Sequence, residues 1–125
     1  MIAGIGTDIT EVRRFEKWVK DPSMLERFFN EKEMSSAKSQ VARCQHYAAR
    51  FAAKEAFSKA LGTGITGFGL KDVYITNDSE GKPLLNIEGA ALSLMKERLG
   101  QCRAFVSLSH EKEYATAFVI LEKGE

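Results

Sequence analysis

The fold of this chain is decided by the stretch Arg50-Phe-Ala-Ala-Lys-Glu-Ala-Phe-Ser-Lys-Ala-Leu-Gly62. It belongs to a longer alanine-rich run, from Arg43 to Leu61, that contains neither glycine nor proline. Alanine has the highest intrinsic helix propensity, and a glycine directly after such a run is a common helix end. The sequence therefore predicts one long helix over Arg43 to Leu61, terminated by Gly62.

The faces of this helix differ in character. At 100° per residue, a single arc is formed by Ala49, Ala52, Ala53, Ala56, Phe57 and Ala60. Because alanines let a neighbouring backbone approach closely, we expect this arc to be buried. Glu55 and Lys59 lie four residues apart on another face, where a solvated ion pair is the simplest interpretation. Arg50 and Lys54 form a second charged pair at the same spacing.

Shorter elements are expected on both sides of the long helix. Before it we expect a strand from Ile2 to Ile9 and helices from Glu11 to Lys20, from about Met24 to Asn30 and from Glu31 to Ser39. After it we expect a loop from Gly62 to Gly69, strands at Val73 to Ile75 and Leu85 to Ile87, a helix from Gly89 to Leu99, and a hairpin with strands Ala104 to His110 and Ala115 to Leu121. This order predicts an α+β fold, a short antiparallel sheet with one long central helix, in a single domain spanning residues 1–125.

Composition narrows the classes of function. A net charge of +1 over 125 residues argues against nucleic acid as a partner attracted by bulk charge. We expect no membrane span, because no apolar stretch approaches the eighteen residues that one requires. The start of the chain does not resemble a secretory signal, and Cys44 and Cys102 lie far apart in sequence. These features favour the reducing cytoplasm.

Two carboxylates are candidates for a metal site. Asp8 lies where an apolar strand is expected to end, so it is either a helix N-cap or a functional carboxylate. Glu55 is a second carboxylate that the fold could bring to it. Magnesium suits such a pair, because it accepts one or two protein carboxylates and takes its remaining ligands from water and substrate phosphates.

Three other patterns in the sequence have more than one interpretation. The run from Gly62 to Gly67 matches GxGxxG, but it follows a helix, whereas the dinucleotide fingerprint follows a strand. A serine hydrolase is rejected, because Ser109 and His110 are adjacent on a strand and point to opposite faces. His110 is then a phosphate ligand or a structural histidine. The basic residues from Arg13 to Lys20 form either a solvated surface or a dock for an acidic partner helix.

Taken together, these residues resemble the holo-acyl-carrier-protein synthase family, the small-subunit class of 4'-phosphopantetheinyl transferases. Three motifs carry the resemblance: Gly4-Ile-Gly-Thr-Asp-Ile9, the long-helix motif extended to Gly64, and Ser107-Leu-Ser-His-Glu111. The turn Gly81-Lys-Pro83 also matches. Their order and spacing agree with the family over nearly the whole chain.

The resemblance implies specific roles for these residues. Asp8 and Glu55 would bind Mg2+, and Glu55 and Lys59 would be catalytic, with Lys59 near the phosphates. The nucleotide end of coenzyme A would be held by Arg50, Lys59, Gly64 and His110. Arg14 would meet the acyl carrier protein, and the chain would assemble as a homotrimer with active sites between subunits.

The implied reaction is attack of a carrier serine on the β-phosphate of coenzyme A, with departure of 3',5'-ADP. Charge stabilisation and positioning would do most of this work. Lys59 would stabilise or protonate the leaving phosphate, and either Glu55 or a metal-bound water would accept the serine proton. Two alternatives remain: a non-catalytic module that captures acidic helices through its basic segment, and a metal-dependent nucleotide hydrolase.

Overall fold

The computed structural model describes residues 1–124. The chain begins with β1 (Ile2–Glu11), the 3-10 turns η1 (Val12–Phe15) and η2 (Trp18–Lys20), α1 (Pro22–Phe28), the 3-10 turn η3 (Glu31–Glu33) and the long helix α2 (Gln40–Leu61). It continues with the 3-10 turn η4 (Leu70–Asp72), β2 (Val73–Asn77), β3 (Pro83–Ile87), α3 (Gly89–Leu99), β4 (Cys102–His110) and β5 (Tyr114–Lys123).

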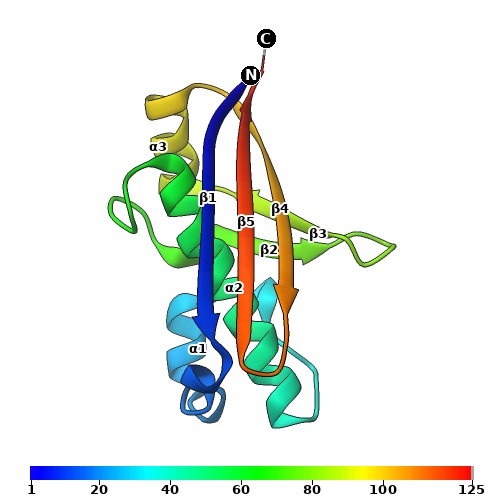
Figure 1. Ribbon diagram of the computed structural model, residues 1–125. Helices are drawn as coiled ribbons and strands as arrows, with labels where there is room; N and C mark the ends of the chain where they lie inside the picture. Colours follow the sequence, from blue (N-terminus) through cyan, green and yellow to red (C-terminus); the bar gives the residue numbers. More distant parts are fainter. Residues whose placement is uncertain (125) are drawn as a thin grey trace.

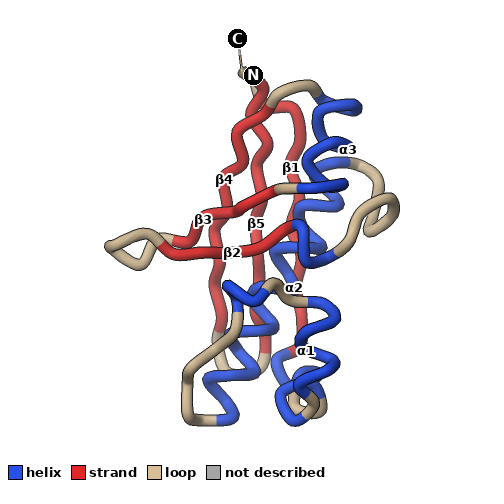
Figure 2. The backbone as a smooth tube through the Cα atoms, turned by 180° about the vertical axis from the view of Figure 1, so that it is seen from behind, coloured by secondary structure: helices blue, strands red, loops and turns tan. Residues whose placement is uncertain are grey.

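The strands form two antiparallel sheets. One has the order β1-β5-β4, and the other is the hairpin of β2 and β3. Helix α2 packs along one face of the three-stranded sheet, mainly against β1 and β5 (Figure 1). Seen from behind, the β2–β3 hairpin crosses the same face beside α2 (Figure 2). The predicted α+β class, with its one long helix, is confirmed.

Two glycines of β1 let its backbone lie directly against α2. A Cβ at Gly6 would lie 1.9 Å from the carbonyl oxygen of Ala56, and one at Gly4 would lie 2.1 Å from that of Ala60. Alternate residues of the strand share a face, so Asp8 lies on this helix-facing side as well. The close approach therefore brings the Asp8 carboxylate to α2.

The alanine arc of α2 is buried as predicted, with exposed fractions between 0% and 6%. It packs against Ala117, Val119 and Leu121, the inward-facing residues of β5. A second apolar cluster, rich in aromatic rings, fills the space between η1, α1 and the N-terminal half of α2. Both ends of the helix are capped: the Ser39 side chain accepts from the Ala42 amide, and Gly62 adopts a φ of 88°. The Ser39 cap starts the helix three residues before Arg43.

Three predicted helices differ from the structure. The expected helix from Glu11 to Lys20 is wrong: β1 continues to Glu11, and two 3-10 turns follow. The Val12 amide donates to the Glu113 carbonyl at 2.8 Å, which extends the pairing of β1 with the hairpin past the predicted strand end. The helix expected from Glu31 to Ser39 is only the turn η3, because Met34 is already extended. Helix α1 begins two residues early, because Asp21 caps it instead of Ser23.

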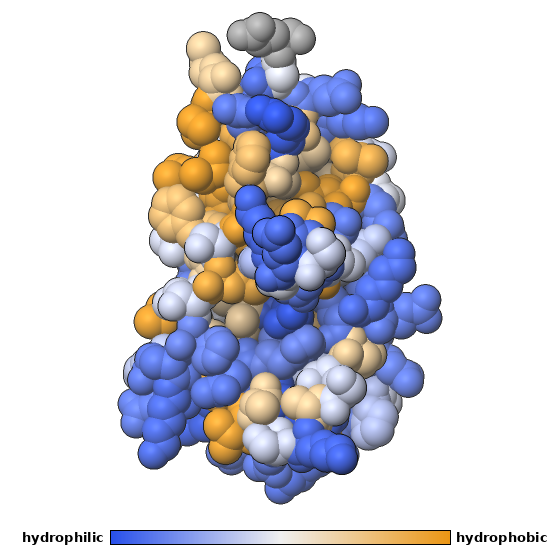
Figure 3. Space-filling model, turned by 90° about the vertical axis from the view of Figure 1, so that its right-hand side faces the viewer, coloured by the Kyte–Doolittle hydropathy of each residue, from blue (hydrophilic) through white to orange (hydrophobic). Residues whose placement is uncertain are grey.

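The outer face of the three-stranded sheet is apolar and uncovered. Ile5 and Ile9 of β1, Phe105 of β4 and Phe118 of β5 are each between 41% and 63% exposed. In Figure 3 hydrophobic side chains line the left edge, where this face is seen side on, above a mostly hydrophilic lower part. Among the helices of residues 1–124, none is both long enough and apolar enough to span a membrane.

Candidate active site

Asp8 and Lys59 form the first part of the site. The Lys59 Nζ lies 3.3 Å from Asp8 Oδ1 and donates to the Thr7 carbonyl at 3.0 Å. Thr10 Oγ1 donates to the other Asp8 carboxylate oxygen at 2.9 Å. The N-cap interpretation of Asp8 is therefore wrong, because Asp8 lies inside β1. The expected helical ion pair of Glu55 with Lys59 is also wrong, because Lys59 reaches across to the strand.

Glu55 completes a pair of carboxylates at this position. Burial and the nearby Asp8 charge raise the pKa of Glu55, in that order, while Lys59 and Arg14 oppose the increase. Two carboxylates that repel each other at the surface of a core fit a hard cation, which would relieve the repulsion. Within residues 1–124, no group of three or more His, Cys, Asp or Glu side chains is placed to hold a metal. A cation here would take its other ligands from water or from a substrate.

Arg14 lies at the rim of this carboxylate pair. Its guanidinium is 4.9 Å from the centroid of the Phe51 ring and 6.0 Å from that of Phe15. Phe51 is one turn of α2 before Glu55, and the charge of Arg14 acts on the pKa of Glu55. The turn η1 thus places an exposed cation, held over an aromatic ring, beside the predicted metal ligands.

Arg50 and His110 meet in a separate hollow between α2, the end of β4 and the β2–β3 hairpin. The residues that line it are Ala42, Gln45, His46, Ala49, Arg50, Asn77, Gly81, Pro83, Leu108 and His110. Arg50 Nη1 donates to the His46 carbonyl at 3.2 Å, and Nη2 donates to Asn77 Oδ1 at 3.4 Å. Arg50 Nε is buried and has no hydrogen-bond partner among the described residues. The guanidinium that lines this hollow carries a positive charge, which suits it to bind an anion.

These two groups of residues lie on different sides of α2. Arg50 and Glu55 are five residues apart, about 140° around the helix. The structure brings Asp8, Glu55 and Lys59 together, and it brings Arg50 and His110 together. Within one chain, the hollow and the carboxylate pair are therefore separate surfaces.

Gly64 lies in the loop after α2. It has a φ of 66°, and its carbonyl accepts from the Thr66 amide at 2.9 Å and from Thr63 Oγ1 at 2.7 Å. A Cβ at Gly64 would meet no described atom within 4 Å. The loop needs a glycine here for its left-handed backbone, and it leaves open space in which a ligand can approach.

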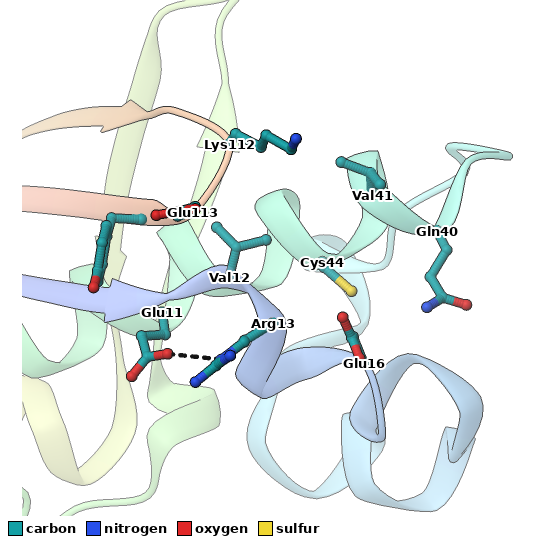
Figure 4. A pocket seen from close by; sticks show the side chains of 10 residues that line it. Glu11, Val12, Arg13, Glu16, Gln40, Val41, Cys44, Lys112 and Glu113 are labelled. Carbon is teal, nitrogen blue, oxygen red and sulfur yellow. Dashed lines mark hydrogen bonds and ion pairs between the residues drawn. The ribbon is translucent and has the colours of Figure 1, made fainter.

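A third hollow lies at the turn between β4 and β5 (Figure 4). Glu11, Arg13 and Glu16 line it on one side and Lys112 and Glu113 on the other, with the Cys44 thiol between them. Burial is the largest cause that raises the pKa of the Cys44 thiol. A thiol that stays protonated is a poor nucleophile, so this hollow does not resemble a reactive site.

Lys54 and Glu33 were not found from the sequence. Lys54 appeared to be a member of a surface charge pair, yet its side chain is 1% exposed and its Nζ lies 2.6 Å from Glu33 Oε1. The Glu33 side chain is 0% exposed. A capping box, in which Asn30 and Glu33 bond each other's backbone, was the one local signal that could have drawn attention to Glu33.

The fold and this site define a small enzyme of the group-transfer class. The sequence model of the 4'-phosphopantetheinyl transferase superfamily matches residues 4–119, and the chain belongs to that superfamily. More particularly, it is 50% identical to a holo-[acyl-carrier-protein] synthase of Treponema denticola over 98% of this chain and 99% of that protein. It is 45% identical to the synthase of Geobacter sulfurreducens over 98% of this chain and 99% of that protein.

Solved structures of holo-[acyl-carrier-protein] synthases are similar to this chain in both sequence and fold. A holo-(acyl-carrier-protein) synthase of Bacillus anthracis, in complex with CoA (3',5'-ADP), has a TM-score of 0.82 and 38% identity over 99% of both chains. The synthase of Helicobacter pylori, in complex with coenzyme A, has a TM-score of 0.79 and 30% identity over 94% of this chain and 99% of that one. The predicted resemblance to this family is confirmed.

Proposed function

We propose that this chain, as one domain over residues 1–125, transfers 4'-phosphopantetheine from coenzyme A to a serine of apo acyl carrier protein. 3',5'-ADP is the second product. The observation that carries the proposal is the convergence of Asp8, Glu55 and Lys59 in a chain that is similar over its full length to holo-[acyl-carrier-protein] synthases. The cytoplasm is the expected location of this reaction.

Asp8 and Glu55 would hold Mg2+. The raised pKa of Glu55 supports this assignment, because part of the increase comes from Asp8. When bound, the cation would neutralise pyrophosphate charge that two carboxylates alone would repel. Lys59, whose side chain is 54% exposed beside Asp8, is free to approach a phosphate oxygen.

The chain's own residues account for the proton and the charge. The serine oxygen forms a bond to the β-phosphorus, and the bond from that phosphorus to the bridging oxygen breaks. Glu55, or a water that it orients, would accept the serine proton. Lys59 stabilises or protonates the leaving 3',5'-ADP phosphate.

The hollow around Arg50 would receive the nucleotide end of coenzyme A. The positive charge of Arg50 in this hollow supports an anionic ligand there, and His110 lines the same surface. Gly64 offers the open backbone described above. Arg14 would meet the acidic carrier protein, because it is an exposed cation next to Glu55.

We propose a homotrimer with active sites between subunits. Two observations support assembly: the exposed apolar outer face of the sheet, and the separation of the Arg50 hollow from the Asp8 pair within one chain. A neighbouring copy could supply the missing half of each site. Phe118→Asp should then dissociate the assembly and abolish transfer, as checked by light scattering and assay at one protein concentration. A wild-type monomer with full activity would contradict this arrangement.

The direct test incubates the chain with apo carrier, coenzyme A and Mg2+ and measures the mass of the carrier. We expect the mass gain of one phosphopantetheine, lost in chelator and nearly abolished in folded Asp8→Ala and Glu55→Ala. Glu97→Ala, which removes an exposed carboxylate of α3, is the matched control. Release of 3',5'-ADP without carrier would favour a hydrolase, and coenzyme A binding without transfer would favour a binding module.

A further inference from the structure

The buried ion pair of Glu33 and Lys54 lies outside the catalytic residues, yet every hydrogen-bonding group in it has a defined partner. Lys54 Nζ donates to Glu33 Oε1 at 2.6 Å, to the Val73 carbonyl at 2.6 Å and to the Leu70 carbonyl at 3.0 Å. An ammonium has three donors, so all three are used. The pair joins α2 to the start of β2 and to η3.

Glu33 is also part of a closed ring of contacts that leads to Arg50. Its Oε2 accepts from the Ile75 amide at 3.0 Å, and two residues further along β2 is Asn77. Asn77 Oδ1 accepts from Arg50, and Arg50 donates in turn to the His46 carbonyl. His46 Nε2 contacts the Glu33 carbonyl at 2.5 Å, which closes the ring.

The protonation state of His46 is consistent with its place in this ring of contacts. Burial first, and then the charge of Arg50, lower the pKa of His46 to about 4. The His46 imidazole is therefore neutral at pH 7, and its Nε2 must carry the proton, because the Glu33 carbonyl can only accept a hydrogen bond. Burial also lowers the pKa of Arg50 while the Glu33 charge opposes the decrease. Glu33 thus acts on Arg50 through space as well as through the ring.

We propose that Glu33, together with Lys54 and Asn77, positions the Arg50 guanidinium for the nucleotide end of coenzyme A. Removal of the Glu33 carboxylate releases β2 at Ile75, and Asn77 then no longer holds Nη2. Arg50 would lose its orientation in the hollow, while Asp8, Glu55 and Lys59 stay in place on the other side of α2. This inference rests on the proposed function, because coenzyme A is the ligand assigned to the hollow.

The test measures binding of coenzyme A by calorimetry and, separately, steady-state kinetics with both substrates varied. Glu33→Gln and Asn77→Ala should each raise the Kd and KM for coenzyme A about tenfold. The KM for carrier and kcat at saturating coenzyme A should stay within about threefold, which a merely structural loss would not produce. Glu97→Ala, which removes an exposed carboxylate of α3, is the control and should change neither constant.

A double variant, Glu33→Gln with Lys54→Met, separates positioning from folding. It leaves no unpaired buried charge, so it should recover thermal stability relative to either single variant but keep the raised Kd. Recovery of the wild-type Kd in this variant, or a wild-type Kd in both Glu33→Gln and Asn77→Ala, would overturn the inference. Asn77 is exposed, so its variant should remain folded if the buried variants do not. A wild-type chain that binds no coenzyme A would instead overturn the proposed function.

Discussion

A single methyl group at Gly6 should separate β1 from α2. The Cβ of Gly6→Ala would lie 1.9 Å from the Ala56 carbonyl oxygen and 2.7 Å from the Ala60 amide nitrogen, where ordinary contact begins at 3.4 Å. The obstacle is backbone on both sides, so no side chain can rotate away. The helix and the strand would therefore have to move apart by roughly 1.5 Å along a buried contact.

The expected loss follows from that displacement. Overpacking a core costs about 1–3 kcal/mol, and a backbone obstacle places Gly6→Ala at the upper end, about 3 kcal/mol. For a domain of this size, that lowers the Tm by about 10 °C. Because Asp8 is two residues from Gly6 and Glu55 is adjacent to Ala56, the two carboxylates would also move apart. A displacement of about 1 Å at a reacting centre lowers kcat/KM about 100-fold.

Thermal unfolding at a fixed protein concentration and the carrier mass assay measure these two effects. Gly69→Ala is the matched control: Gly69 is exposed, has a φ of −86°, and no described atom lies within 4 Å of an added Cβ. The Gly69→Ala substitution should leave the Tm unchanged or raise it slightly. A Gly6→Ala protein with the wild-type Tm and kcat/KM would refute the claim that direct backbone packing positions Asp8.

Three further predictions concern the charged groups. Lys59→Ala should lower kcat about 10²–10⁴-fold in the mass assay, and an unchanged kcat would return Lys59 to a surface ion pair with Asp8. Because the pKa of Glu55 is raised, its charged form costs stability that develops as the pH rises above the ordinary value and is complete above the raised pKa. Glu55→Gln should therefore raise the Tm in chelator at pH 7, and the difference from the wild type should disappear below the ordinary value. A Glu55→Gln variant with the same Tm as the wild type at pH 7 would contradict this prediction. Arg14→Glu should raise the KM for carrier and leave that for coenzyme A unchanged, whereas Arg13→Glu, whose partner is Glu11, should have the smaller effect; an Arg14→Glu variant impaired only toward coenzyme A would assign η1 to the nucleotide site.

The sequence alone was sufficient for features that depend on short-range physics. The alanine run predicted α2 to within three residues at one end and to the residue at the other, because helix propensity and a glycine cap act locally. The alternation of apolar residues predicted the final hairpin for the same reason. The motifs also marked Asp8 and Glu55 as candidate metal ligands, and the structure places the two carboxylates close enough to interact, while their role as ligands stays a prediction.

Only the tertiary structure decided which charges meet. Lys59 is paired with Asp8, 51 residues away, and Lys54 is buried against Glu33, 21 residues away. Helical spacing favours neighbours at four residues, but burial and ion pairing depend on whichever strand packs against that face, which periodicity does not encode. The angle between Arg50 and Glu55 is set by helical spacing, but the strands that each residue faces were decided by tertiary packing.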